Sequence, residues 1–570
     1  MSGTIWGRAA GLCRTLIDAT RRVIGMNAEL RDEVQPTPLK LRWLNLCFAA
    51  LTIGAGLLAY DEGLRQKMHR VAPDAIEMLA QTIAVDISQR YHGTRGYVGR
   101  SEVLQTLLDG GVTGRQNLID KFGLTYPENG ERPELIEKAI KDALALKDLP
   151  EATFGNQKLF APDANDPGFV DYLSLSFDLF GFQVSAFFYF YFLVFGISVA
   201  LFLLCYHADA LPLLVLSIAV VALLTLLDSQ LFTNVNLRTI HNQRFLGSLC
   251  LVPYLHLLFT FLVYRRPSWT RVVVTVLQAA LLTLLMFARS SSFWMILSLV
   301  AIAGVNAYFR LGRSYVETRL KRLATFAFSW PSFLVIGGLV CSLAYKTVTL
   351  HPIYNLDIYI PYHMVWHNAY MGLGVHPEWK ERGDKHKGKP IPDALTDNMA
   401  WMGAVAEGDE RYGITEAYLN NNVIGGFPAP RIRLHEQLIR DRFLRFVLHN
   451  PRFALEVYLW YKPKMFFQEL LWAFEGYRWS LGTMLCQVAL LALGASAWRL
   501  LAIPDDVRKT LSTALIVTGV MSLIPVVWTY PLRHVVGEQF LIWIAIVLYF
   551  ATFLLSEAWS RVRPLVPRHA

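Results

Sequence analysis

The chain has 570 residues, of which 54% are hydrophobic and only 17% are charged, and its formal net charge is +9. This composition excludes an ordinary soluble protein of several domains, which would carry more charge. The basic excess lies in short segments beside apolar runs and not on one polar face, so no nucleic-acid partner is indicated. The sequence therefore predicts a membrane protein.

Ten apolar stretches are long enough to cross about 30 Å of hydrocarbon as helices. They lie at 43–60, 184–206, 211–229, 246–264, 272–288, 291–308, 328–348, 480–500, 511–529 and 539–556. We therefore expect an all-α polytopic protein with about ten transmembrane helices, surrounded by membrane lipids. His256, inside the fourth span, is expected to hydrogen-bond to a neighbouring helix.

Basic residues in the short connections predict the orientation, because cytoplasmic loops carry an excess of Lys and Arg. If the N-terminus is cytoplasmic, the inner connections hold the basic clusters within 265–271, 310–322 and 499–509. The short outer connections carry fewer basic residues. The pattern predicts that both termini are cytoplasmic, an N-in, C-in topology.

Two predicted outer segments are long. The expected division is a cytoplasmic segment at 1–42, seven spans at 43–348 that include an outer loop at 61–183, a second outer domain at 349–479, and three spans with a cytoplasmic tail at 480–570. The second outer domain ends in two amphipathic helices. In the first, Ile439, Phe443, Phe446 and Val447 share one face while arginines occupy the other. This pattern predicts juxtamembrane helices that lie on the membrane surface.

The layout resembles the GT-C superfamily of lipid-carrier-dependent glycosyltransferases, which includes the protein mannosyltransferases and the lipid A aminoarabinose transferases. The likeness covers most of the chain and rests on the two long outer segments, after spans one and seven, and on three stretches. These are NDPGFVDYLSLSFDLFGFQVSAFFYFYFLVFGISV, RDRFLRFVLHNPRFALEVYLWYKPKMF and YPLRHVVGEQFLIWIAIVLYF. The chain departs from the superfamily after span one, where it reads AYDEGLRQK without an Asp-x-Asp or Glu-x-Asp motif.

The resemblance implies an inverting enzyme that moves a sugar from a polyprenyl-phosphate carrier to a glycan, lipid or protein acceptor outside the cytoplasm. It also implies a carboxylate in the first outer loop, because an acceptor hydroxyl is a poor nucleophile until a nearby base takes its proton. Asp61 and Glu62, where span one leaves the membrane, are candidates for this base, followed by Asp166. The alternatives for these residues are interfacial solvation and helix capping.

The departing carrier phosphate requires positive charge at the outer interface. Arg289 lies at the outer junction of spans five and six, and Arg533 and His534 match the late segment of the superfamily. Snorkelling to lipid headgroups is the alternative for the arginines. His367 is expected in a wall of the acceptor cleft. His363 lies four residues before it, but no HExxH motif is present, so neither a metal nor a cofactor is indicated besides the lipid-linked donor.

Other functions stay open. A surface-polysaccharide ligase or polymerase would also use outer arginines but would attack a polyprenyl diphosphate. A transporter or flippase would need charged or broken helices in mid-membrane. A catalytically silent scaffold would explain the missing acidic motif. The predicted outer loops lack cysteines and Asn-x-Ser/Thr sequons, which favours a bacterial inner membrane.

Overall fold

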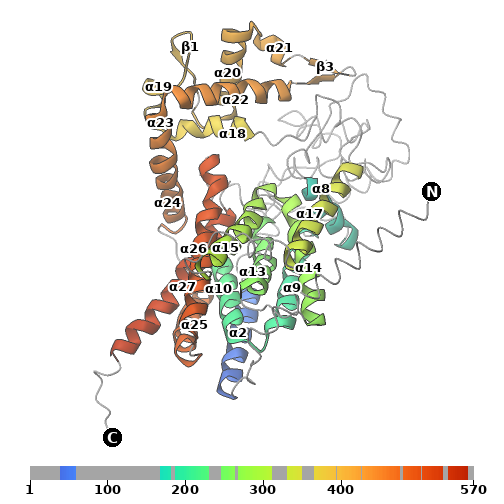
Figure 1. The fold of residues 1–570 in the computed structure, drawn as a ribbon, viewed down its shortest axis with the longest axis vertical. Coiled ribbons are helices and arrows are strands. Elements are labelled where there is room, and N and C mark those ends of the chain that lie inside the picture. The colour runs from blue at the N-terminus through green and yellow to red at the C-terminus, as the bar shows by residue number, and fades with distance from the viewer. Residues whose placement is uncertain are drawn as a thin grey trace, which may run out of the picture.

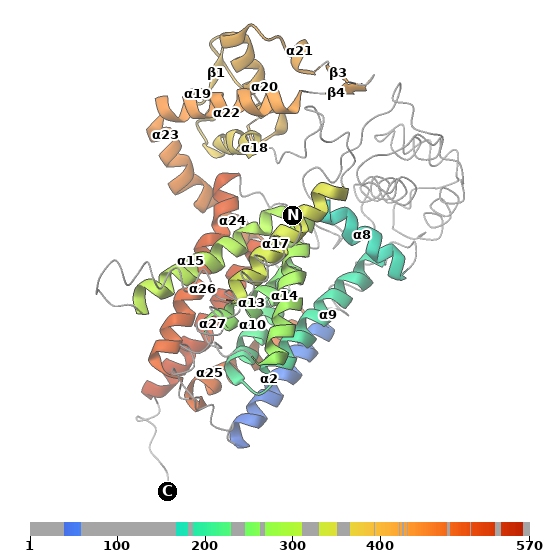
Figure 2. The same cartoon turned by 45° about the vertical axis from the view of Figure 1, so that its right-hand side comes forward.

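The structure is a computed structural model of the protein. It describes residues 39–58, 167–180, 186–229, 246–262, 268–310, 330–349, 365–392, 394–420, 422–424, 427–429, 431–475, 479–501, 503–529 and 537–562. Within these ranges the chain is mostly helical, and Figures 1 and 2 show a bundle of long helices with a smaller helical domain at one end.

Each of the ten predicted spans coincides with a helical segment of the bundle. The segments are α2 (Leu39–Leu58), α9 (Ala186–Tyr206), α10 (Ala210–Leu227), η3 (Gly247–Cys250) with α13 (Leu251–Leu262), α14 (Trp269–Ala288), α15 (Trp294–Arg310), α17 (Trp330–Thr349), α25 (Leu481–Leu500), α26 (Asp505–Trp528) and α27 (Gly537–Val562). Among the described residues, seven helices are long and apolar enough to cross a membrane: α2, α9, α10, α14, α25, α26 and α27. The protein is therefore a helical, multi-pass membrane protein.

Helix α10 lies at the centre of the bundle. Its sequence, ALPLLVLSIAVVALLTLL, is apolar on every face, and it packs against α2, α13, α25 and α27. A helix that is hydrophobic all round is stable when it is covered on all sides, and the candidate span in α10 is 100% buried. Single polar contacts link it to its neighbours: Ser217 donates to the Phe48 carbonyl at 3.0 Å, and Gln487 Nε2 donates to Thr225 Oγ1 at 2.8 Å.

We call residues 365–472 the cap domain, and the end of the bundle that contacts it the cap end. Figures 1 and 2 show α8 (Pro167–Phe180) at this same end. The elements of the cap domain are α18 (Val365–Met371), η6 (Gly372–Val375), α19 (Trp379–Arg382), β1 (Lys385–His386), β2 (Lys389–Pro390), α20 (Asp397–Glu407), η7 (Gly408–Tyr412), α21 (Glu416–Asn420), β3 (Asn422–Ile424), β4 (Phe427–Ala429), α22 (Ile432–His449), α23 (Pro451–Glu456), η8 (Val457–Tyr461) and α24 (Lys462–Trp472). Strands β1 and β2, and likewise β3 and β4, form antiparallel pairs. The predicted outer loop 61–183 lies outside the described residues except for α8.

The apolar face that the sequence predicts for helix α22 is covered by protein. Its predicted apolar face packs against α18 and α20, and Ile439, Phe443 and Phe446 are at most 7% exposed in the core of the cap domain. Periodicity identifies an apolar face but does not distinguish a protein core from lipid as the partner. The apolar face of α22 therefore contacts protein and not lipid, while the predicted position of the helix at the membrane surface stays a prediction.

A buried ion network fixes the β1–β2 pair against α20 and α22. Arg442 of α22 is 3% exposed and binds both carboxylate oxygens of Asp384, at 2.6 and 2.9 Å. Its guanidinium also donates to Glu410 at 2.5 Å and to the Lys385 carbonyl at 2.6 Å. The Tyr370 hydroxyl donates to Asp384 at 2.6 Å. The arginine is thus surrounded by acceptors, as a buried cation requires.

Candidate functional site

Two of the seven predicted site residues, Arg289 and His367, lie in the described part of the chain. The other five lie outside it: Asp61, Glu62, Asp166, Arg533 and His534. The structure therefore places only the first two.

Arg289 ends α14 at the cap end of the bundle. Its backbone is extended (φ −145°, ψ 90°), and its N–H donates to the Leu285 carbonyl at 3.0 Å. Its own carbonyl accepts from the Ser292 N–H at 2.9 Å, which closes a tight turn before α15. This turn carries the Ser292 hydroxyl to α27, where it donates to Glu538 Oε2 at 2.6 Å.

Glu538 is a carboxylate buried between helices beside this turn. It is 2% exposed and accepts from Ser292, from Trp294 Nε1 at 3.0 Å and from Gln539 Nε2 at 3.0 Å. Gly247 leaves room for it, since a Cβ there would lie 1.7 Å from Glu538 Oε2. Sequence reasoning missed this site. The sequence does contain a signal for the site, because Glu538 is an ionisable residue in the first turn of an apolar span.

A second buried carboxylate, Asp228, lies at the cap end of α10. It is 6% exposed and accepts from the Ser480 N–H at 3.2 Å, from the Ser480 hydroxyl at 2.8 Å and from the Thr483 hydroxyl. Ser480 is the N-cap of α25, so the carboxylate faces the positive end of that helix dipole. Asp228 therefore ties α10 to α25.

Lys462 fastens the cap domain to the bundle. It is 0% exposed, and its Nζ donates to the carbonyls of Val527 at 2.6 Å and Trp528 at 3.3 Å, at the C-terminal end of α26. Carbonyls at a helix C-terminus attract cations. The ammonium also lies 4.1 Å from the centre of the Tyr458 ring. Gly372 allows close approach at this junction, because a Cβ there would lie 2.0 Å from the Thr529 carbonyl oxygen.

His367 lies in the interior of the cap domain, and its predicted place in a wall of an acceptor cleft stays a prediction. Its ring is 2% exposed, with Nδ1 3.0 Å from His435 Nε2 and Nε2 3.1 Å from Asp397 Oδ1. If Asp397 accepts the Nε2–H of His367, its Nδ1 can accept the Nε2–H of His435. Glu436 accepts the backbone N–H groups of Trp366 and His367, each at 3.0 Å, at the start of α18.

Acidification should destabilise the cap domain through His435. Burial, followed by the neighbouring His367, lowers the pKa of His435 to about 3, and among the described residues His435 Nδ1 has no hydrogen-bond partner that could accept from an added proton. Below about pH 6.5, the pKa of a histidine in the unfolded chain, the unfolded chain binds a proton at His435 that the folded domain does not bind. The free energy of unfolding therefore falls as the pH decreases, by about 1.4 kcal/mol per pH unit, until the pH reaches about 3.

Hydrogen exchange of residues 365–472 in the intact protein, corrected for the intrinsic rate, measures this loss. His435→Gln keeps a donor at the Nε2 position without titrating, and should flatten part of the pH dependence. An unchanged slope in that variant would contradict the assignment to His435.

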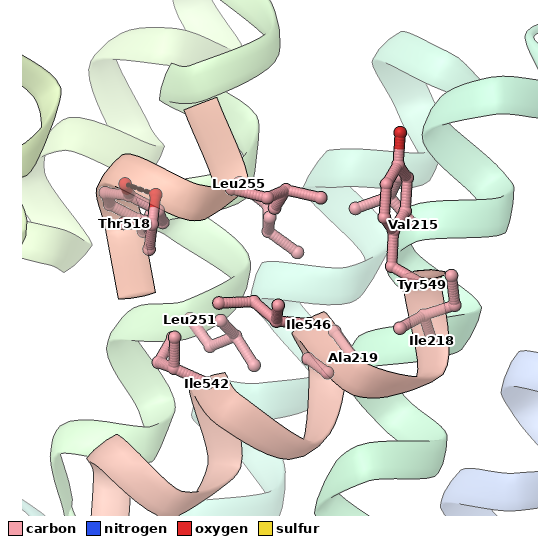
Figure 3. A pocket seen from close by; sticks show the side chains of 12 residues that line it. Val215, Ile218, Ala219, Leu251, Leu255, Thr518, Ile542, Ile546 and Tyr549 are labelled. Atoms are coloured by element: carbon pink, nitrogen blue, oxygen red, sulfur yellow. Dashed lines mark hydrogen bonds between the residues drawn. The ribbon is translucent and has the colours of Figure 1, made fainter. Parts of the chain in front are cut away.

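Two other features, possible metal ligands and an internal void, give less support for a functional site. Among the described residues, no group of three or more His, Cys, Asp or Glu side chains is placed to hold a metal ion. A void of about 30 Å³ lies between α10, α13, α26 and α27, lined mainly by apolar side chains such as Leu251, Ile542 and Ile546 (Figure 3). It has room for about one or two waters. The void is thus too small for a lipid chain or a sugar.

The cap end of the bundle therefore holds two buried carboxylates, a buried lysine and the arginine-bearing turn. Comparisons of the chain with protein-family models, with curated proteins and with solved structures find no match.

Proposed function

We propose that the protein is a glycosyltransferase that moves a sugar from a polyprenyl-phosphate donor to an acceptor at the outer face of the membrane. The supporting observation is that buried ionisable side chains gather at the cap end of the bundle. Asp228, Lys462 and Glu538 are at most 6% exposed and lie at this end, as Arg289 does. Chemistry on a lipid-borne phosphate requires fixed charges at that depth, because the headgroup stays at the membrane surface.

The proposal includes a topology. All ten helical segments cross the membrane, both termini are cytoplasmic, and the cap domain lies outside a bacterial inner membrane. Its support is the distribution of basic residues, since the clusters within 265–271 and 499–509 lie beside the helix ends opposite the cap domain.

The interior of the bundle favours this proposal over a transporter. Transporters bind substrates and coupling ions near the middle of the bilayer. Among the described residues, the buried charged side chains of the bundle stay at the cap end. His256, in mid-span, pairs with Thr275 of the neighbouring helix at 3.0 Å, which is the interhelical contact expected from the sequence.

In the proposed reaction Arg289 holds the carrier phosphate, with Arg533 and His534 as further donors. Asp61, Glu62 or Asp166 supplies the base that takes the proton of the acceptor hydroxyl. Glu538 positions the Arg289 turn through Ser292, 2.6 Å away. The new glycosidic bond forms as the bond between the sugar and the carrier phosphate breaks, and the phosphate leaves on the lipid.

Arg289→Ala should weaken binding of a long-chain polyprenyl phosphate by roughly 10- to 150-fold, because a charge-assisted hydrogen bond contributes about 1.5–3 kcal/mol. Arg289→Lys should recover only part of the loss, since lysine keeps the charge without the two-pronged geometry. Titration of the purified protein in nanodiscs, with the corresponding polyprenol as the phosphate-free ligand, measures the effect.

Arg271→Ala is the matched control, because Arg271 lies near the opposite end of the same helix, α14. It should leave binding unchanged. Equal losses in both variants, or none in either, would contradict the role of Arg289 in phosphate binding. Much tighter binding of the polyprenyl diphosphate would favour a polysaccharide ligase.

A further inference from the structure

One continuous helical segment, residues 451–472, belongs to two cores. Phe453 and Val457 pack in the core of the cap domain, whereas Phe466 packs in the core of the bundle. The segment contains a π-helical turn, η8, between α23 and α24. Its extra residue gives a spacing of five between Val457 and Lys462, which keeps both on the buried side. We call this segment the strut.

The opposite face of the strut is exposed and apolar. Its large side chains are 40–71% exposed: Leu455, Leu459, Trp460, Phe467 and Leu471. A contiguous apolar face of this kind marks a surface with a partner. Lys464 lies between Trp460 and Phe467 in the sequence. It is compatible with an apolar face, because the aliphatic part of a lysine side chain can lie along apolar groups while its ammonium reaches water.

The neighbours of α24 identify that partner. The ring centres of Phe466 and Phe540 are 5.3 Å apart, and those of Phe467 and Trp543 are 5.4 Å apart. Phe540 and Trp543 lie in the first two turns of α27, a helix long and apolar enough to span the membrane. The lower half of the strut therefore lies beside the end of a membrane span, at the depth where that span enters lipid.

We propose that the strut is seated in the outer leaflet, with Leu471 and Phe467 among acyl chains and Trp460 at the headgroups. Phe467, on the exposed face of the strut, contacts Trp543 of α27, and an indole ring such as that of Trp460 favours the headgroup region. The cap domain is then attached to the membrane by the lipid contacts of the strut, and to the bundle by the hydrogen bonds of Lys462 to α26. This placement does not depend on the proposed reaction.

Spin labels at single cysteines test the placement in proteoliposomes of the full chain, with the native cysteines replaced. A label at 471 should collide with oxygen several-fold more than with a water-soluble nickel complex, and a label at 459, beside Trp460, should give a ratio between those of the two references. Position 547, which is 61% exposed in mid-span of α27, is the lipid-facing reference, and Lys380 of α19 is the aqueous one.

Nickel access at 459 and 471 equal to that at 380 would overturn the proposal, because the face would then lie in water. The proposal would also be overturned if neither oxygen nor the nickel complex reached these labels at high protein density, but both reached them after the protein was diluted in lipid. A second copy of the chain would then cover the face.

A second measurement keeps the native cysteines. Brominated acyl chains should quench the fluorescence component lost in Trp460→Phe and spare the component lost in Trp379→Phe, since Trp379 is only 2% exposed in the cap core. Equal quenching of the two components, or none of the Trp460 component, would contradict the lipid contact.

Discussion

Arg442→Met should strongly destabilise the cap domain while the bundle stays folded. The substitution leaves Asp384 and Glu410 facing each other without the guanidinium that binds both. Removing one partner of a buried ion pair destabilises by about 3–5 kcal/mol, because the remaining charge is left uncompensated. That is a large fraction of the roughly 5–15 kcal/mol that stabilises a typical protein. Protease sensitivity and hydrogen exchange of residues 365–472 in the intact protein should both rise.

Arg440→Met is the control within the same helix. Arg440 has a side chain 45% exposed and pairs with Asp441 at the surface, where such a pair contributes about 0–1 kcal/mol. Arg442→Lys should fall between the two, because lysine cannot bind both oxygens of Asp384 in the same geometry. If Arg440→Met and Arg442→Met are equally mild, the network is not a main source of stability in the cap domain.

Glu538→Ala should destabilise the bundle by at least about 3 kcal/mol, since each buried donor left without an acceptor costs about 1–3 kcal/mol. Among the described residues, the donors that lose this carboxylate are the hydroxyl of Ser292, the indole of Trp294 and the amide of Gln539. The midpoint of thermal unfolding in nanodiscs should fall. Binding of polyprenyl phosphate should weaken too, because the turn that carries Arg289 loses its contact with α27.

Gly247→Ala should reproduce the effect with the carboxylate still present, because the added Cβ would occupy the position of Glu538 Oε2. Glu557→Ala, near the other end of α27, is the control and should change neither measurement. Normal stability in Glu538→Ala would mean that its donors find other acceptors, and the positioning role would then be wrong.

The helices of the bundle could be predicted because a span needs only about 20 consecutive apolar residues, which is a local property. The contacts between side chains of different helices could not be predicted in the same way. Glu538 and Ser292 are 246 residues apart in the chain, so nothing near either one indicates their contact. The apolar face of α22 was recognised, but its partner was assigned to lipid when it is protein. His367 was expected in a wall of the acceptor cleft, but its hydrogen-bond partners His435 and Asp397 could not be predicted, because the fold brings them together from two other helices.

The central position of α10 has a consequence for biogenesis. During synthesis α10 enters the bilayer long before α25 and α27 exist, so two of its faces first contact lipid and are transferred to protein only when the last spans arrive. Its surface suits both environments, because acyl chains are as apolar as leucine side chains. The insertion intermediate is therefore an open bundle that the C-terminal helices close. A chain shortened by its last three spans should still insert, but it would leave two faces of an apolar helix in contact with the bilayer.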